Sequence, residues 1–157
     1  MDTRDRAPVV SVSAADEPLF RKRREGWCVA MRRALIRSER KFDSNVEQVR
    51  AARVFVEDVV AHWGIAPEDA VLVVGELAAN AQRHARSEFN VSVCNFDGAL
   101  MVEVTDASPE TPELIEAPSS ALSGRGLLIV DRVARAWGFR PTSAGGKTVW
   151  AELDGRA

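Results

Sequence analysis

The amino-acid sequence predicts an α+β fold, a two-layer sandwich in which helices cover one face of a mixed, mainly antiparallel sheet. Two observations carry this prediction. Segments with apolar residues at helical spacing are interleaved with pairs of strands joined by short turns, and the order lacks the regular alternation of a doubly wound sheet. The length of 157 residues suits one domain with one core.

The N-terminal segment is expected to lie outside the folded domain. Residues 1–26 carry proline, serine and charge without periodicity, and they end in a basic cluster at residues 21–24. We therefore expect a disordered basic tail over 1–26 and a single domain over 27–157. Residues 27–42 mix apolar side chains with arginines, so a helix and an edge strand are both compatible with this segment.

Two amphipathic helices are expected next. Residues 44–47 fit a capping box that begins with Ser44 and ends with Glu47, and valines and alanines follow at helical spacing until Gly64. Pro67 suits the first turn of a second helix, which runs to about Ala85. The second helix is mostly apolar, so we expect most of it to be buried.

The second half of the sequence predicts a hairpin, a long loop, a third helix and a last hairpin. Residues 89–93 and 100–104 alternate like strands, with Asp97 and Gly98 as the turn between them. Residues 108–123 are rich in proline, serine and glutamate, and residues 108–126 form a candidate lid, because long loops in compact domains are usually functional or mobile. A helix over 127–137 and a strand over 148–153 complete the domain.

Composition excludes several classes of function. The net charge of −2 gives no positive excess for binding a phosphate backbone, so nucleic acid is not the expected partner. No apolar run reaches the roughly 20 residues that cross a bilayer, and the N-terminus does not resemble a secretory signal. We expect a cytoplasmic protein without membrane contact. Cys28 and Cys94 stand apart from any metal-binding pattern, which favours two reduced thiols.

Three polar residues share one face of the second helix. Glu76, Asn80 and His84 follow one another at steps of four residues among apolar neighbours. Such a stripe either faces water or, where the carboxylate is buried, needs a cation, a proton or a ligand to offset several kcal/mol of desolvation. The spacing leaves both possibilities open, and it assigns no role to His84.

Two further features are compatible with a bound nucleotide. Asp106 follows a strand, where it is either a turn residue or the acceptor of a hydrogen bond from a ligand amino group. Gly124 and Gly126 let the backbone approach a phosphate at the start of the third helix. The sequence has no P-loop, no dinucleotide-binding GxGxxG and no protein kinase signature, so a nucleotide must be held in another way.

Four segments occur in an order that is more specific than any one of them: ELAANAQRHA, VEVTDAS, SGRGLLIVDRVARAWG and GGKTVWAEL. They resemble the GHKL superfamily, and within it the small anti-sigma factor and serine kinase branch common in actinobacteria. The resemblance covers about residues 41–153 and implies that the ligands are ATP and Mg²⁺.

The resemblance also implies a role for each matching residue. Glu76 matches the catalytic base, Asn80 the residue that coordinates magnesium, and Asp106 the aspartate that accepts a hydrogen bond from the adenine amino group. The other nucleotide-binding positions are Gly124, Arg125 and Gly126 on the lid beside the phosphates, and Thr148 on the last strand near the adenine.

The sequence departs from the family pattern in two places. After Asp106 the usual glycine-containing stretch is replaced by Ala, Ser and Pro at residues 107–109, which affects the adenine pocket. Ser123 precedes the lid glycines where some kinases of this branch carry an arginine, and Arg125 lies between the glycines instead. The second departure bears on phosphate transfer more than on nucleotide binding.

The function that the resemblance implies is that of an ATP-binding anti-sigma factor with serine/threonine protein kinase activity toward an anti-sigma-factor antagonist. Its partners would be a sigma factor and a STAS-type antagonist, and members of the family often form homodimers. One alternative is a regulatory module that binds ATP without transferring phosphate. Another is nucleic-acid binding through the arginines of residues 21–41. Sensor histidine kinases do not fit, because no separate helix pair carries an acceptor histidine and His62 lies at a helix end.

Overall fold

A computed structural model describes residues 19–23, 36–96, 98–112 and 125–155 of the chain. The expected lid falls mostly on residues 113–124, outside this part, and so do Gly124, Ser123 and Cys28. In chain order the described elements are β1 (Leu19–Arg23), β2 (Ile36–Phe42), α1 (Val46–His62), α2 (Glu68–Ala85), β3 (Phe89–Phe96), β4 (Ala99–Asp106), α3 (Gly126–Val133), β5 (Ala136–Pro141) and β6 (Lys147–Asp154).

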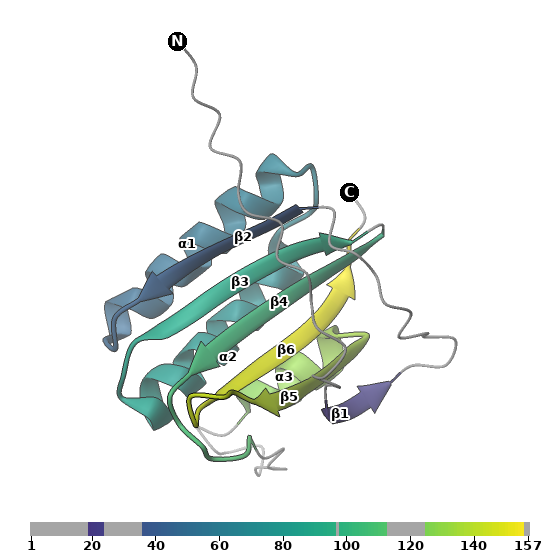
Figure 1. Cartoon of the computed structure of the whole chain (residues 1–157). Helices are drawn as coiled ribbons and strands as arrows, with labels where there is room; N and C mark the ends of the chain where they lie inside the picture. Colours follow the sequence, from purple (N-terminus) through teal and green to yellow (C-terminus); the bar gives the residue numbers. More distant parts are fainter. Residues whose placement is uncertain (1–18, 24–35, 97, 113–124, 156–157) are drawn as a thin grey trace.

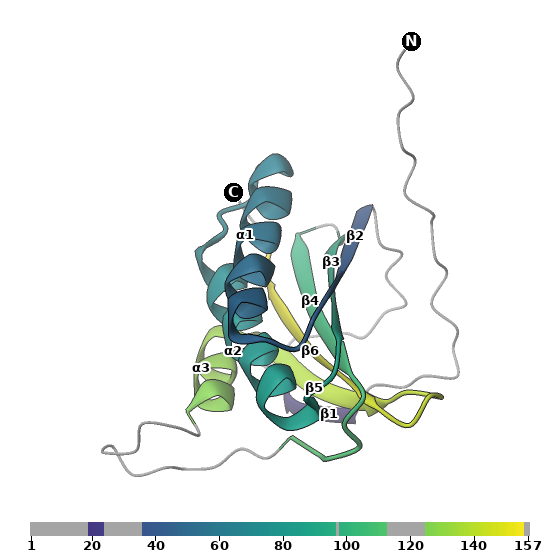
Figure 2. The ribbon, with the colours of Figure 1, turned by 90° about the vertical axis from the view of Figure 1, so that its left-hand side faces the viewer.

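The strands form one sheet, and the helices cover one of its faces. The strand order is β1-β5-β6-β4-β3-β2, and each described pair of neighbours is antiparallel. Figure 1 shows the sheet in front of the helices, and the side view in Figure 2 shows α1, α2 and α3 on the same side of it. The predicted two-layer α+β fold is confirmed, with antiparallel pairing at every described position where a mixed sheet was expected.

The core fills the space between the two layers. Along β4, Leu100, Val102 and Val104 belong to the buried core that also includes Val56 of α1 and Val73 of α2. Burying such side chains contributes about 25 cal/mol for each Å² of apolar surface removed from water. Since neighbouring residues of a strand point to opposite faces, the alternate residues of β4 and β6 lie on the face away from the helices.

The first two helices begin and end close to the predicted positions. The N-cap of α1 is Asn45, whose side chain accepts a hydrogen bond from the backbone N–H of Gln48 at 3.1 Å, one residue after the predicted Ser44. Asn45 takes this role because its backbone is extended, with φ −142° and ψ 162°. Helix α2 ends where Arg86 adopts a left-handed conformation with φ 48°. Within the described part of the chain, no helix combines the length and the hydropathy needed to cross a membrane.

The third helix is shorter than predicted. Helix α3 ends at Val133, and Ala134 is extended with ψ 145°, so Trp137 lies on strand β5 where a helix was expected. The apolar residues over 127–137 are compatible with a helix and with a strand. The residues from Ala136 onward form a strand because they pair with β6. The indole of Trp137 is fully buried and donates a hydrogen bond to Asp131 at 2.9 Å.

The N-terminal region contributes two edge strands. Strand β2 pairs with β3 along its whole length, which confirms the edge-strand alternative for residues 36–42. Strand β1 pairs with β5 and lies inside the segment 1–26, where no strand was expected. Residues 1–18 and 24–35 lie outside the described part, so the remainder of the expected tail stays a prediction.

The turn before β6 approaches the end of β4 very closely. A side chain built on Gly146 would overlap the backbone carbonyl oxygen of Asp106 and lie 2.9 Å from the Cα of Ala107. We expect Gly146→Ala to lower the free energy of unfolding by about 1–3 kcal/mol, because two backbone segments must separate. Ser143→Ala, at an exposed position of the same turn, is the control and should change stability by less than about 0.5 kcal/mol. Equal urea midpoints for the two variants would contradict this account of Gly146.

Candidate functional site

The end of α2 and the end of β4 meet at one end of the sandwich (Figure 1). Only residues 86–88 connect α2 to β3, and Asn90 at the start of β3 pairs with Thr105 near the end of β4. Across this end, His84 Nδ1 lies 3.6 Å from Glu110 Oε2, so the last turn of α2 adjoins the segment that follows β4. His84 at the end of α2 therefore lies beside the segment that follows β4, whereas Glu76 lies in the middle of α2.

Glu76 and Asn80 face the first residue of α3. Both side chains are half-buried on α2. A side chain carbon built on Gly126 would lie 2.8 Å from Glu76 Oε2 and 3.8 Å from Asn80 Oδ1. The structure thus brings together three of the residues predicted from the sequence, and a side chain at position 126 would require the Glu76 carboxylate to move. His84, one turn beyond Asn80, has an exposed side chain.

The N-terminus of α3 points its free N–H groups into the same region. The first hydrogen bond within the helix runs from the N–H of Ile129 to the carbonyl of Arg125 at 3.1 Å. The N–H groups of Gly126 and the next two residues therefore have no partner within the helix, and no side chain among the described residues caps this end. Such a terminus attracts anions such as phosphate. Arg125, at the N-cap, is exposed next to it.

Asp106 lies in a second polar group, together with a residue that the sequence did not single out. Its carboxylate is almost fully buried, and Oδ1 accepts hydrogen bonds from the backbone N–H of Ser108 at 2.8 Å and from Lys147 Nζ at 2.9 Å. Lys147 Nζ also donates to the carbonyl oxygen of Ser108 at 3.3 Å. Lys147 is the first residue of β6 and pairs directly with Asp106. The segment GGKTVWAEL contained this signal, because a lysine at the start of a buried strand needs an anionic partner.

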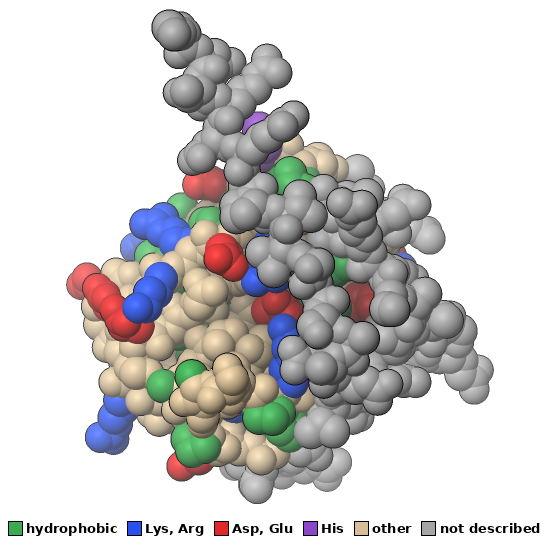
Figure 3. Space-filling view, in the orientation of Figure 1, with side chains coloured by type: hydrophobic (Ala, Val, Ile, Leu, Met, Phe, Trp, Pro, Cys, Tyr) green, Lys and Arg blue, Asp and Glu red, His purple; other side chains and the backbone are tan. Residues whose placement is uncertain are grey.

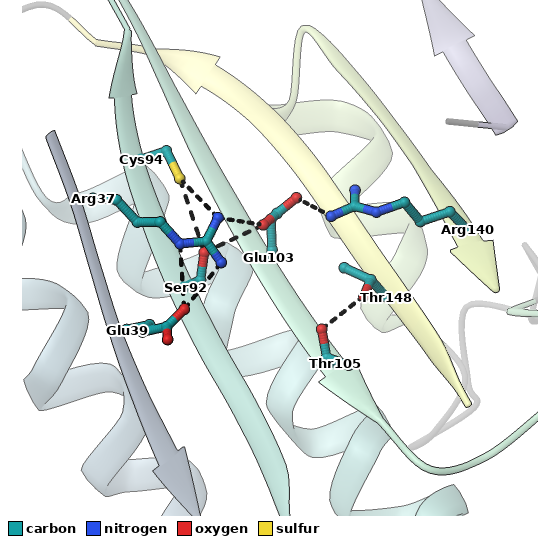
Figure 4. Close-up of polar contacts among 8 residues, drawn as sticks. All are labelled: Arg37, Glu39, Ser92, Cys94, Glu103, Thr105, Arg140 and Thr148. Carbon is teal, nitrogen blue, oxygen red and sulfur yellow. Dashed lines mark hydrogen bonds and ion pairs between the residues drawn. The ribbon is translucent and has the colours of Figure 1, made fainter. Parts of the chain in front are cut away.

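Thr148 is not brought to the side of Asp106. Its hydroxyl forms a hydrogen bond with that of Thr105 at 2.7 Å, and both belong to the face of the sheet opposite the helices (Figure 4). Because side chains alternate between the two faces along β6, Lys147 lies beside Asp106 and Thr148 lies on the outer face of the sheet. The nucleotide-binding role of Thr148 stays a prediction.

The outer face of the sheet carries a separate network centred on Glu103. Arg140 donates to Glu103 Oε1 at 2.6 Å, Ser92 donates to Oε2 at 3.2 Å, and Arg37 lies 3.6 Å from Oε2 (Figure 4). In the space-filling view, charged side chains of both signs lie on this face (Figure 3). The two guanidinium groups compensate the buried carboxylate, so this network supports the sheet.

Cys94 belongs to this outer network and is expected to be chemically inert. Burial raises the pKa of its thiol, the charge of Glu103 raises it further, and the opposing effects of Arg37 and Ser92 do not cancel these two. Because the thiolate is the reactive form, we expect alkylation of Cys94 at pH 8 to be at least about tenfold slower in the native protein than in urea. Peptide mass spectrometry separates Cys94 from Cys28, and equal rates in the two conditions would contradict the expectation.

Two surface hollows lie away from these residues. One, of about 260 Å³, is lined by the start of α2 and by Leu100 and Leu153 at the other end of β4 and β6. The other, of about 420 Å³, lies between α1 and α2 beside Arg53 and Leu72. Neither is lined by a sequence-predicted site residue. We therefore place the candidate site at Glu76, Asn80 and the N-terminus of α3, and we expect Asp106 at the end of β4 to border it.

Within the described residues, three helices lie on one face of an antiparallel sheet, and a polar face of α2 is directed at the start of α3. Residues 42–153 match the family model of the histidine kinase-like ATPase domain. This match covers well over half of the chain, so the chain belongs to that family, whose members are described as ATPases. None of the curated proteins compared with the chain matches it.

A solved structure agrees with this assignment of the fold. The chain is similar to a crystal structure of the RsbU and RsbW domains of Rv1364c from Mycobacterium tuberculosis, with a TM-score of 0.54 and 17% sequence identity. The match covers 76% of this chain and 32% of that chain, so this chain spans about a third of the length of the protein it matches.

Proposed function

We propose that this protein is a cytoplasmic anti-sigma factor that binds ATP with Mg²⁺ and phosphorylates a serine or threonine of an anti-sigma-factor antagonist. The observation that carries the proposal is the approach of Gly126 to both Glu76 and Asn80. A carboxylate and an amide oxygen lie one helical turn apart beneath a free helix N-terminus, an arrangement that suits a metal-bound triphosphate.

On the phosphate side, the amide oxygen of Asn80 would hold the metal, because Mg²⁺ prefers oxygen ligands. Bound Mg²⁺ neutralises charge on the phosphates. In the described part of the chain, no three His, Cys, Asp or Glu side chains cluster as a metal site. The N–H groups at the start of α3, with Arg125 beside them, bind the phosphate oxygens.

Glu76 is proposed to activate the acceptor hydroxyl. The phosphoryl group moves from the terminal bridging oxygen of ATP to the hydroxyl oxygen of the antagonist, ADP leaves, and the hydroxyl proton passes to the Glu76 carboxylate. Phosphoryl transfer depends mainly on positioning and charge neutralisation, so one base, one metal ligand and one helix terminus are a sufficient set. At the other side of the site, Asp106 accepts a hydrogen bond from the amino group of adenine.

The partners are inferred from the order of the four sequence segments. These segments resemble those of small anti-sigma factors and serine kinases, whose partners are a sigma factor and a STAS-type antagonist and which often form homodimers. The similarity to the structure that contains RsbU and RsbW domains supports the fold of such a protein, at an identity too low to support its activity.

Phosphate transfer can be tested with γ-labelled ATP and the antagonist obtained by pull-down from the native cell. We expect label on a serine or threonine of the antagonist in the presence of Mg²⁺ and none in EDTA. Binding of ATP without transfer to any captured antagonist would overturn the kinase and favour a regulatory module that uses ATP as a ligand alone. Absence of both binding and transfer would overturn the proposal as a whole.

A further inference from the structure

Lys147 and Asp106 form a buried ion pair at the proposed adenine end of the site. The Nζ to Oδ1 distance is 2.9 Å, and the exposed fractions of the two side chains are 9% and 3%. Removing two charges from water costs several kcal/mol per ion, and their attraction often fails to exceed that cost. A gain in folding stability is therefore a poor explanation for this buried ion pair. Its position at the proposed adenine end of the site points to a role in binding.

The pair has hydrogen-bonding capacity left over. A lysine ammonium group carries three N–H donors, of which Asp106 Oδ1 and the carbonyl oxygen of Ser108 use two. Asp106 Oδ1 accepts from Lys147 and from the N–H of Ser108, whereas Oδ2 accepts from no residue within the described ranges. One donor and one acceptor thus remain next to each other in a buried place.

Adenine presents the complementary pair on one edge, with the N6 amino group as donor and the adjacent ring nitrogen N1 as acceptor. We propose that Lys147 is a specificity-determining residue that donates a hydrogen bond to N1 of adenine while Asp106 Oδ2 accepts one from N6. This inference rests on the proposed ATP site. In the same orientation guanine places its O6 against the carboxylate and its N1–H against the ammonium group, so both contacts are mismatched.

The geometry of β6 explains how a lysine reaches this place. Gly146 lets the backbone before β6 lie against Asp106 and Ala107, and pairing with Asp106 directs Lys147 to the helix side of the sheet. Its long stem is then buried and its ammonium group meets the carboxylate. An aspartate alone would recognise only a donor on the base, whereas the pair recognises a donor and an acceptor together.

Nucleotide analogues test the inference on the wild-type protein. Calorimetry compares ATP with 1-deaza-ATP, in which N1 is replaced by C–H, and with 3-deaza-ATP as a control altered at the ring position N3. Loss of a hydrogen bond to a charged donor should weaken 1-deaza-ATP about 10- to 100-fold, while 3-deaza-ATP should bind like ATP. GTP should bind more weakly than 1-deaza-ATP, because it is mismatched at two positions.

The variant Lys147→Met assigns the effect to the lysine. It should bind ATP and 1-deaza-ATP with nearly equal affinity, whereas Lys41→Met, at an exposed position of β2, should keep the wild-type ratio. Methionine leaves the Asp106 carboxylate without its cationic partner. If this variant unfolds as a result, the comparison of ATP with 1-deaza-ATP on the wild-type protein is the test of the proposed hydrogen bond from Lys147. Equal wild-type affinities for ATP and 1-deaza-ATP would overturn the role of Lys147 while ATP binding stands. Failure of every nucleotide to bind would overturn the proposed function and this inference with it.

Discussion

We expect Glu76→Gln to slow the proposed phosphate transfer to the antagonist by about 10² to 10⁴, the usual range for loss of a general base. Glutamine keeps the shape of the side chain beneath Gly126 and much of its hydrogen bonding, but it cannot take a proton from the attacking hydroxyl. Affinity for ATP should change little, because the proposed metal and phosphate contacts belong to Asn80 and to α3. Single-turnover measurements with labelled ATP separate the transfer step from binding.

Glu57→Gln is the matched control for this variant, since Glu57 is exposed on α1 and borders no proposed contact. It should transfer phosphate at the wild-type rate. Both variants should still bind the sigma factor, because that binding depends on the contact surface and involves no proton transfer. A Glu76→Gln protein that transfers phosphate as fast as wild type would remove Glu76 from the catalytic role.

Replacing Asn80 with alanine removes the one protein ligand proposed for the metal. In wild type, Mg²⁺ should strengthen ATP binding, and in Asn80→Ala this advantage should fall by about 10- to 100-fold. Titrations with ATP in Mg²⁺ and in EDTA measure the advantage directly. The fold should persist, because Asn80 is half-buried beside Gly126 and lies outside the apolar core.

Asn95→Ala is the control variant, because it removes an asparagine amide at a position away from the proposed site. Asn95 lies on β3 opposite Leu100, at the other end of the sheet, and should leave the Mg²⁺ dependence unchanged. If Asn80→Ala binds ATP with the same Mg²⁺ advantage as wild type, the metal is held by other groups.

The elements that depend on local pattern could be predicted from the sequence. Helix α2 follows from the spacing of its valines and alanines, and the β3–β4 hairpin follows from strand alternation around Gly98, whose φ is +73°. The same helical spacing predicted that Glu76 and Asn80 share a face. Their approach to Gly126 depends on the packing of α3 on α2, which no local pattern encodes.

Other features could not be predicted from the sequence, because they depend on contacts between segments that are distant along the chain. Trp137 belongs to a strand because β5 pairs with β1 and β6, and the apolar run around it does not distinguish helix from strand. The side-chain directions along β6 also depend on distant contacts. A shift of one residue in its pairing would turn Lys147 to the outer face of the sheet and Thr148 to the helix side. Only the register with β4 places Lys147 against Asp106 and Thr148 against Thr105.

We propose that Mg²⁺ and ATP bind on the side of α2 that faces α3 and the end of β4. A titration of ¹⁵N-labelled protein with ATP and Mg²⁺, followed by the backbone amide signals, tests it most directly. We expect the amide signals of Gly126, Asp106 and Lys147 to shift in a saturable manner, while those of Leu72 and Leu153, which border the two hollows, stay in place. Shifts confined to Leu72 and Leu153, or no saturable shift at all, would contradict it.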